Sequence, residues 1–327
     1  MVRIVVTCVL ALWAFQAQAL TLKIATISPD GTTWMKELRK GAALIKARTE
    51  GRVKLRFYPG GVMGSGKNVL RKIRIGQLHG GAMTGGGLEQ IYFDSQIYSL
   101  PFAFRSFAEV DYVRARMDDM ILQGLYEHGY VGFGLAEGGF AYLMSNAPIR
   151  RNADLQGHKV WVPEGDTMSQ LVFKAADISP VPLPLPDVLT GLQTGLIDTV
   201  ATSPIGAIAL QWHTRVKYVT DTPLMYLYGV LIVQRKAFER LRPADQAVMK
   251  SVLEEVFRRL NRINREENRQ ARQALMDQGI EFVQPPAEEQ AHWYQLVARA
   301  VIDNHLFSPG ILETFQAHLD AYRAQHP

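Results

Sequence analysis

Apolar and polar residues alternate in short runs along the first part of the chain, and helical patterns separate these runs. Residues 20–25 and 53–58 alternate with a period of two, which predicts strands, and residues 33–49 between them predict a helix. Residues 68–75 predict a second helix, and the small residues at 79–84 predict a short buried strand. This succession of strands and helices favours a parallel sheet with helices on both faces.

A second α/β unit follows the first. Residues 107–128 predict a helix, and two strands then leave the first unit. Two similar lobes are therefore predicted. The remaining predicted elements are strands at 130–135, 141–145, 158–163, 197–201 and 226–233, and helices at 168–176 and 187–194.

A long helix is predicted beyond these lobes, because no proline or glycine interrupts the helical pattern between Pro243 and Gly279. At 1.5 Å per residue it would be roughly 50 Å long, so we expect it to lie across both lobes. Its arginines recur every three or four residues and would share one face. Either Glu254 and Glu255 pair with this solvated face, or the face docks a partner. The apolar stripe comprises Leu253, Phe257, Leu260 and Ile263, and the arginine face comprises Arg258, Arg262, Arg265, Arg269 and Arg272.

Residues 1–19 have the pattern of a secretory signal peptide. Arg3 precedes an apolar run over residues 4–15, and Ala17 and Ala19 mark the place where a signal peptidase would cut. The apolar run is too short for a membrane span, and no later segment is apolar over the length that a bilayer requires. We therefore expect an exported monomer that is free in the periplasm and does not insert into the membrane.

Composition argues against several classes of function. The only cysteine, Cys8, lies inside the predicted signal peptide, so the mature chain would have no disulfide and no thiolate metal ligand. The eight histidines do not recur at the three- to five-residue spacing of metal pairs, so we expect no metal. The formal net charge is +5 with acids and bases interleaved, and no basic block carries aromatic residues. Nucleic acid is therefore not an expected partner.

Neither nucleotide binding nor catalysis is expected. The segment GVMGSGKN, residues 61–68, is close to a P-loop, but Asn68 stands where a serine or threonine must reach magnesium. No Gly-x-Ser-x-Gly motif is present. Glu164 and Asp166 lie two residues apart and would suit acid–base chemistry, yet acids beside a turn glycine are common in loops. We expect no cofactor and no enzymatic activity.

Candidate binding residues lie in loops at strand ends, where open α/β sheets bind ligands. In the second lobe the strand at 158–163 runs into a loop that gathers Trp161, Glu164 and Asp166. Each candidate residue could equally be structural. The candidates of the first lobe are Ser28, Trp34, Thr84, Gly85, Gly86 and Phe102.

Four blocks of the sequence carry a resemblance to a known family. They are SNAPIRRNADLQGHKVWVPEGD, ISPVPLPLPDVLTGLQTGLIDTV, RVKLRFYPGGVMGSGKNVLRKIRIGQLHGGAM and YSLPFAFRS, and they resemble the periplasmic solute receptors of TRAP transporters, the tripartite carriers driven by an ion gradient. The resemblance runs over about residues 22–279. It implies an α/β, two-lobed periplasmic binding-protein fold with hinge strands and a long helix spanning both lobes.

The resemblance also implies a division of the chain and a set of partners. Domain I would comprise residues 20–144 and 231–270, and domain II would comprise residues 145–230 and 271–327. The receptor would close on one small molecule and deliver it to the small and large membrane subunits of the transporter. The alternative is a sensor or an envelope-associated binding protein without transport.

Three positions depart from the family pattern. The arginine that usually binds the ligand carboxylate lies in a Lys-Ile-Arg-x-Pro strand, and Trp161 stands in its place. A second arginine often follows Gly-Phe, but here Ala141 follows Phe140, and the usual asparagine aligns with Thr202. The chain would thus be an atypical member that lacks the carboxylate clamp.

The expected ligand follows from this replacement. An unpaired buried carboxylate costs several kcal/mol, so the ligand must match the charge of the cleft. A cleft lined by Trp161 and by Glu137, Glu164 or Asp166 suits a neutral molecule, an aromatic or apolar one, or a cation on the indole face.

An alternative assigns Trp161 to the packing of the second lobe. A base such as Lys67 or Arg71 would then anchor an organic acid. Weaker candidates for ligand contact are Phe140, Tyr142, Trp212 and His213.

Overall fold

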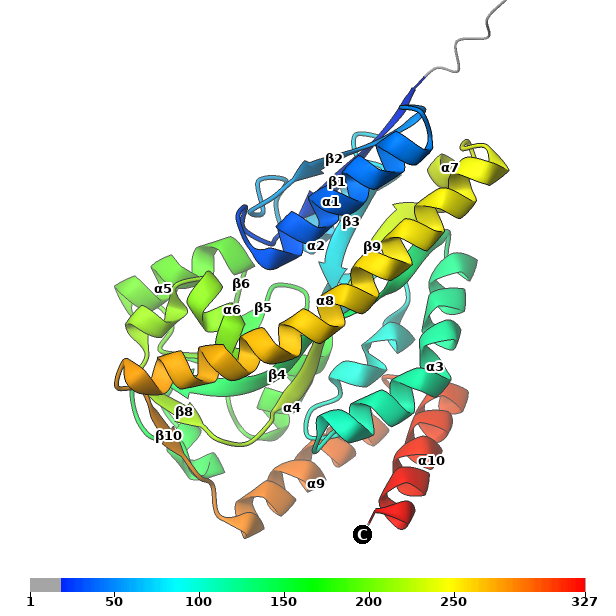
Figure 1. Cartoon of the computed structure of the whole chain (residues 1–327). Helices are drawn as coiled ribbons and strands as arrows, with labels where there is room; N and C mark the ends of the chain where they lie inside the picture. The colour runs from blue at the N-terminus through cyan, green and yellow to red at the C-terminus, as the bar shows by residue number, and fades with distance from the viewer. Residues whose placement is uncertain (1–18, 327) are drawn as a thin grey trace, which may run out of the picture.

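A computed structural model describes residues 19–326 of the chain. The predicted signal peptide, residues 1–19, lies outside them except for its last residue. Within the described residues, no helix combines the length and the apolar composition that crossing a bilayer requires. Two α/β lobes share one eight-stranded sheet, as the arrangement of strands in Figure 1 indicates.

The first lobe has the predicted order of strands and helices. β1 (Leu20–Thr26) pairs in parallel with β2 (Val53–Tyr58) and with β3 (Gly80–Thr84). The helices α1 (Thr33–Arg48) and α2 (Gly66–Arg74) form the connections between these strands. The prediction of a parallel sheet built from strand–helix units is confirmed for this lobe.

Two long antiparallel strands connect the lobes. β4 (Tyr130–Ser145) pairs with β9 (Met225–Gln234), which also pairs with β3. β4 is one strand, although two were predicted at 130–135 and 141–145. The glycine-rich stretch between them continues the pairing through bulges, and Gly139 has a φ of +88° that favours glycine.

The second lobe is built from shorter strands. β7 (Thr199–Thr202) and β8 (Tyr218–Thr220) both pair with β4, and β10 (Glu281–Val283) pairs with β8. β5 (Trp161–Pro163) is shorter than predicted and pairs in parallel with β6 (Val181–Leu183) in a separate sheet. The helices of this lobe are α4 (Thr167–Ala175), α5 (Val188–Thr194) and α6 (Pro204–Ala209), with 3-10 turns η3 (Asn152–Leu155), η4 (Leu185–Asp187) and η5 (Trp212–Arg215).

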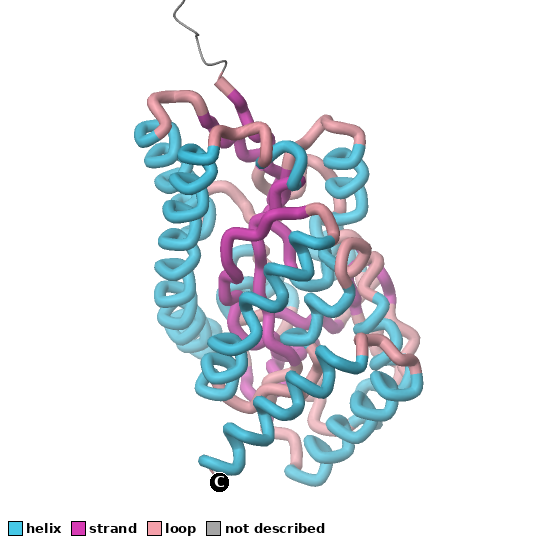
Figure 2. The backbone as a smooth tube through the Cα atoms, turned by 90° about the vertical axis from the view of Figure 1, so that its right-hand side faces the viewer, coloured by secondary structure: helices cyan, strands magenta, loops and turns pink. Residues whose placement is uncertain are grey.

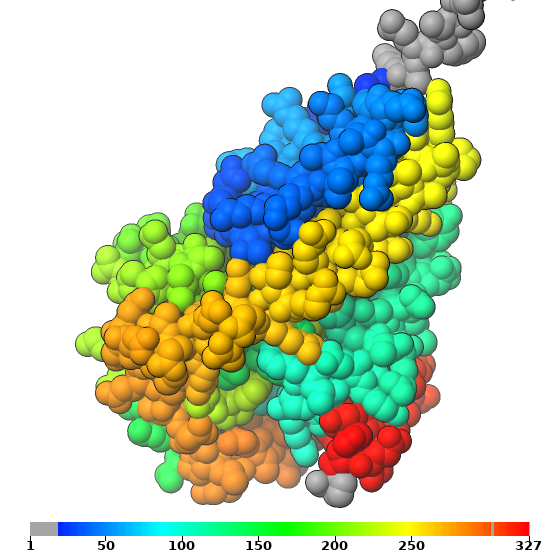
Figure 3. Space-filling view, viewed as in Figure 1, coloured from blue at the N-terminus to red at the C-terminus, as the bar shows by residue number. Residues whose placement is uncertain are grey.

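The predicted long helix is present as α8 (Pro243–Asp277), which follows the short helix α7 (Arg235–Phe238). α8 contacts α1 of the first lobe and α6 of the second. Leu253, Phe257 and Leu260 of the predicted apolar stripe are buried in the core beneath it. Figure 3 shows that the outer surface of α8 runs diagonally across one face of the molecule and over both lobes.

The remaining helices cover the other face of the sheet (Figure 2). α3 (Phe107–Glu127) follows two 3-10 helices, η1 (Gly85–Leu88) and η2 (Phe93–Ser99), and packs on β4. α9 (Ala287–Asp303) contacts α4, and α10 (Pro309–Gln325) packs on α3. The C-terminal helix therefore lies against the first lobe, and the predicted residue ranges of the two domains stay a prediction.

Candidate ligand-binding site

The two lobes meet where the segment after β3 faces the start of α4. Glu89 accepts a hydrogen bond from the Thr167 amide at 2.9 Å and another from the Thr167 hydroxyl. The position that a Cβ would take on Gly86 lies 3.6 Å from Oδ2 of Asp166. Among the predicted residues, Gly86 and Asp166 are thus brought together across the lobes, and Thr84 is exposed at the end of the same strand.

Asp166 is the N-cap of α4. Its Oδ1 accepts a hydrogen bond from the Ser169 amide at 2.9 Å, and its Oδ2 accepts one from the Ser169 hydroxyl at 2.7 Å. Burial raises the pKa of the Asp166 carboxyl, and the hydrogen bonds from Ser169 only partly oppose this shift. The carboxyl therefore holds its proton to a higher pH than an exposed aspartate does.

Trp34 lies at the start of α1 and faces the hinge. Its indole meets the ring of Phe257 edge to face with centroids 5.8 Å apart, and it packs against Gly229 of β9. Its Nε1 is buried and has no hydrogen-bond partner within residues 19–326. Because an unsatisfied buried N–H costs free energy, an acceptor on a ligand would stabilise this site. Ser28, in the preceding loop, bonds with the Thr32 hydroxyl at 2.9 Å.

The indole of Trp161 lies in the core of the second lobe. The residue is only 4 % exposed, and its Nε1 donates a hydrogen bond to the Leu183 carbonyl at 3.0 Å. Its ring meets Trp212 edge to face with centroids 5.1 Å apart. This packing favours the alternative in which Trp161 fills space over one in which it forms an indole wall against the ligand.

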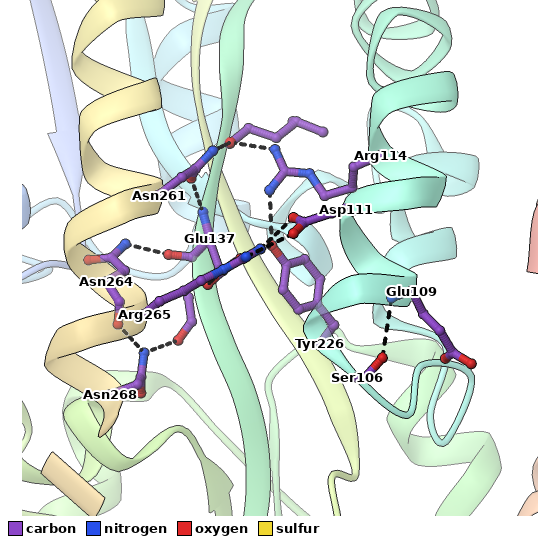
Figure 4. A network of polar contacts seen from close by, with 12 residues as sticks. Ser106, Glu109, Asp111, Arg114, Glu137, Tyr226, Asn261, Asn264, Arg265 and Asn268 are labelled. Atoms are coloured by element: carbon purple, nitrogen blue, oxygen red, sulfur yellow. Dashed lines mark hydrogen bonds and ion pairs between the residues drawn. The ribbon is translucent and has the colours of Figure 1, made fainter. Parts of the chain in front are cut away.

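Glu137 lies in an ion-paired network at the hinge (Figure 4). Arg265 of α8 donates to both of its carboxylate oxygens at 2.8 to 3.0 Å and also pairs with Asp111 of α3. The Tyr226 hydroxyl of β9 donates to Glu137 at 3.2 Å and accepts a hydrogen bond from Arg114 at 2.9 Å. The Glu137 side chain is fully buried, so its charge is compensated within the protein.

Three asparagines of α8 bind the bulged part of β4 (Figure 4). Asn261 accepts a hydrogen bond from the Glu137 amide at 2.7 Å, and Asn264 donates to the Glu137 carbonyl. Asn268 donates to the Gly138 carbonyl at 3.3 Å. Their spacing of three and four residues places them on one helix face. They bind backbone groups of β4 beside its bulges and so attach the long helix to the hinge strand.

A polar cavity of about 460 Å³ opens beside this network, between α3 and α8. Its lining comes from residues 111–119, Glu137 and residues 261–265, with no residue of the second lobe's helices. It is therefore distinct from the place where the lobes meet. Although several carboxylates line it, residues 19–326 contain no group of three or more metal-ligating side chains that could hold a metal ion.

The arginines of α8 do not all lie in the same surroundings. Arg258 and Arg269 pair on the surface with glutamates three residues earlier in the helix, which fits the predicted solvated face. Arg265 instead turns to the hinge, and Arg272 pairs with Asp221 at 2.7 Å. Arg265 and Arg272 are therefore already bound to carboxylates of the protein.

Two predicted aromatic residues pack in the core. Phe140 is buried, and its ring lies 4.8 Å from that of Phe107. Phe102 stacks on Trp293 with centroids 5.5 Å apart and has a φ of +57°, which is unusual for a bulky side chain.

The other predicted positions differ in exposure. Ala141 is buried on β4 and pairs with Met225 of β9. Thr202 is buried at the end of β7, one residue before Ser203, the N-cap of α6. Glu164 is exposed in the loop after β5. The Gly85 backbone lies against the ring of Tyr228, so a side chain there would clash.

Sequence reasoning missed Glu89, Thr167 and Ser169. The spacing of Asp166 and Ser169 matches a helix N-cap and could have indicated the start of α4. Glu89 had no such signal, because its partner Thr167 lies 78 positions further along the chain.

Known proteins resemble this chain in sequence and in fold. The family described as bacterial extracellular solute-binding protein, family 7, matches residues 24–305. The C4-dicarboxylate-binding periplasmic protein of Rhodobacter capsulatus is 24% identical over 86% of this chain and 85% of its own length. The 2,3-diketo-L-gulonate-binding periplasmic protein of Escherichia coli is 24% identical over 73% of this chain and 74% of its own.

Solved structures agree in fold. A TRAP periplasmic solute-binding protein from Xanthobacter autotrophicus, with bound β-D-galacturonate, has a TM-score of 0.85 at 20% identity and covers 91% of this chain and 99% of its own. A Bordetella pertussis extracytoplasmic solute receptor that binds pyroglutamic acid has a TM-score of 0.84 at 20% identity, covering 92% and 100%. The match over residues 24–305 spans most of the sequence, so the chain belongs to family 7 of the bacterial extracellular solute-binding proteins, the DctP-type receptors of TRAP transporters, which bind solutes and are not enzymes.

Proposed function

We propose that this protein is a periplasmic receptor that closes its two lobes on one small organic molecule and delivers it to the small and large membrane subunits of a TRAP transporter. The family match and the two-lobed fold support the capture of a solute. The signal-peptide pattern of residues 1–19 supports export to the periplasm. Uptake rather than sensing is favoured because the similar structures are named as TRAP solute-binding proteins.

The proposed solute is neutral or cationic and partly apolar. The single observation that carries this proposal concerns Trp161, which by resemblance takes the place of the ligand-binding arginine: its indole is buried, and its N–H is bound to the Leu183 carbonyl. The facing surfaces instead place the Glu89 carboxylate against Thr167 and the Asp166 carboxyl beside Gly86. A dicarboxylate would meet these groups without a counter-charge, which is costly in a closed cleft.

Trp34 and the glycines after β3 complete the proposed site. The unpaired indole N–H of Trp34 would donate to an acceptor on the solute. Gly86 brings its backbone close to Asp166, since a Cβ at this position would lie 3.6 Å from Oδ2 of Asp166. For the solute to drive closure, it must contact both lobes. A ligand shifts the equilibrium toward the closed state only when it binds that state more tightly than the open one.

A second candidate is an organic acid held by Lys67. Similar proteins are described with bound galacturonate, succinate or pyroglutamic acid. Lys67 is exposed in the first turn of α2, and its neighbour Gly66 approaches Gly87 after β3, with 3.5 Å from its Cβ position to Cα of Gly87. The lysine would thus be near the proposed site without needing the family arginine.

One experiment separates the two candidates. The exported protein is purified, the solute that copurifies is released by unfolding and identified by mass spectrometry, and its binding to the refolded protein is measured by calorimetry. We expect a neutral or cationic molecule that binds equally to wild type and Lys67→Ala. A carboxylic acid whose affinity falls at least tenfold in Lys67→Ala would establish the second candidate. Uptake of the same molecule by cells that carry the membrane subunits tests delivery, and its absence would favour a sensor.

A further inference from the structure

Glu89 joins elements that belong to different lobes. Its carboxylate accepts hydrogen bonds from the amide and the hydroxyl of Thr167, the first residue of α4. Gln96 of the first lobe donates to the same carboxylate at 3.3 Å. Asp166 caps α4 from within the second lobe. The nine-residue helix α4 therefore has one carboxylate cap of its own and a second one from the opposite lobe.

The position of Glu89 is favourable for a helix start. The first amides of a helix have no partner within the helix, and the helix dipole adds positive charge at this end. Hydrogen bonds from such donors to an ionised carboxylate are stronger than neutral ones. Two donors of one residue meet one carboxylate here, so separating the lobes would break both contacts together.

A second contact between the lobes is apolar, unlike the one at Glu89. The Cβ position of Gly61, in the first lobe, lies 3.0 Å from Cγ of Pro186 in the second, which is an apolar contact. Contacts of that kind have no directional preference. Of these two contacts, the polar one at Glu89 can set the orientation of α4 and of the loop before it.

We infer that Glu89 is a positioning residue for solute capture: it caps α4 from the opposite lobe and favours the closed arrangement that holds the loop of residues 163–166 beside Gly86. This inference rests on the proposed receptor function. It assigns to the protein a closing contact made between its own two lobes. Part of the closed state would then exist before the solute binds.

Lobe separation can be measured without any solute. Cys8 is the only cysteine and lies in the predicted signal peptide, so Lys36→Cys on α1 and Gln193→Cys on α5 can carry a pair of spin labels. Both positions are exposed. After bound solute is removed by unfolding and refolding, pulsed electron double resonance reports the distribution of distances between the lobes. We expect the ratio of closed to open molecules to fall about three- to tenfold in Glu89→Ala. Thr167→Val should lower this ratio as well, because it removes one of the two donors.

Two variants separate positioning from folding. Glu89→Gln keeps a hydrogen-bond acceptor without the charge. Its closed population should therefore lie between those of Glu89→Ala and wild type, and its melting temperature should equal that of wild type. Gln90→Ala is the matched control, because Gln90 is exposed and its side chain makes no hydrogen bond in the described part of the chain. Unchanged distances in both Glu89→Ala and Thr167→Val, or an equal change in the control, would overturn the inference. Since no solute is added, these outcomes are independent of the ligand class proposed above.

Discussion

Arg265 of α8 and Glu137 of β4 form an ion pair in which the guanidinium reaches both oxygens of a fully buried carboxylate. Glu137 lies on a strand that crosses between the lobes, and Arg265 lies near the middle of the helix that spans them. The same guanidinium also pairs with Asp111 of α3. One side chain therefore connects three elements at the hinge, and removing it would leave the Glu137 charge dependent on Tyr226 alone.

The hinge pair predicts a large loss of stability. Arg265→Ala should lower the free energy of unfolding by about 3 kcal/mol, because it leaves a buried carboxylate without its cation. Urea denaturation followed by circular dichroism measures this difference. Arg269→Ala is the matched control on the same helix, since its partner Glu266 is exposed, and it should leave the free energy of unfolding nearly unchanged. Equal effects of the two variants would contradict the role assigned to Glu137.

Asp166 predicts a pH dependence of stability. Burial raises its pKa in the folded state, so the folded protein holds this proton more tightly than the unfolded chain does. The contribution of Asp166 to the free energy of unfolding is therefore complete below the pKa that its carboxyl has in the unfolded chain. It is lost as the pH rises through the higher pKa of the folded state. Asp166→Asn keeps the N-cap and should be more stable than wild type at pH 7 but not at pH 4.

Denaturation at several pH values between 4 and 8 tests this sign. Asp187→Asn serves as the control, because Asp187 is exposed at the start of α5 and its side chain makes no capping bond there. A difference between Asp166→Asn and wild type that does not change with pH would show that the carboxyl titrates normally.

The indole N–H of Trp34 predicts a change in affinity without a loss of stability. Trp34→Phe removes a buried donor that has no partner within residues 19–326, so the free energy of unfolding should not fall. Affinity for the copurifying solute should fall about tenfold, or about 1.4 kcal/mol, if that donor binds the solute. Trp293→Phe removes another buried indole N–H without a partner in the described part of the chain, on α9 beside Phe102, and should leave affinity unchanged. Unchanged affinity in Trp34→Phe would remove this residue from the site.

For Trp161 we expect a loss of stability without a change in affinity. Trp161→Phe retains an aromatic ring beside Trp212 but leaves the Leu183 carbonyl without the indole donor. Stability should fall by about 1 kcal/mol, and affinity for the solute should stay within about twofold. Calorimetry with the copurifying solute measures the second quantity. A loss of affinity of tenfold or more would restore the hypothesis that the indole lines the cleft.

The local pattern of residues was enough to predict most elements. The period of two at residues 20–25 and 53–58 and the uninterrupted helical pattern after Pro243 predict β1, β2 and α8. These features depend on neighbours within one or two turns, so one sequence contains the information. The family blocks likewise predicted the two-lobed receptor, because they preserve short motifs in order along the chain.

Contacts between distant segments could not be predicted from local patterns of residues. The sequence predicts Glu137 as a possible ligand group, but the fold places Arg265, 128 positions away along the chain, against its carboxylate. The sequence by itself determined the strands, the helices and the family of this protein, since periodicity and motif order are local properties. The tertiary structure alone decided which charges are already paired, how Trp161 is buried and that Glu89 meets α4, because those relationships arise only when remote segments pack together.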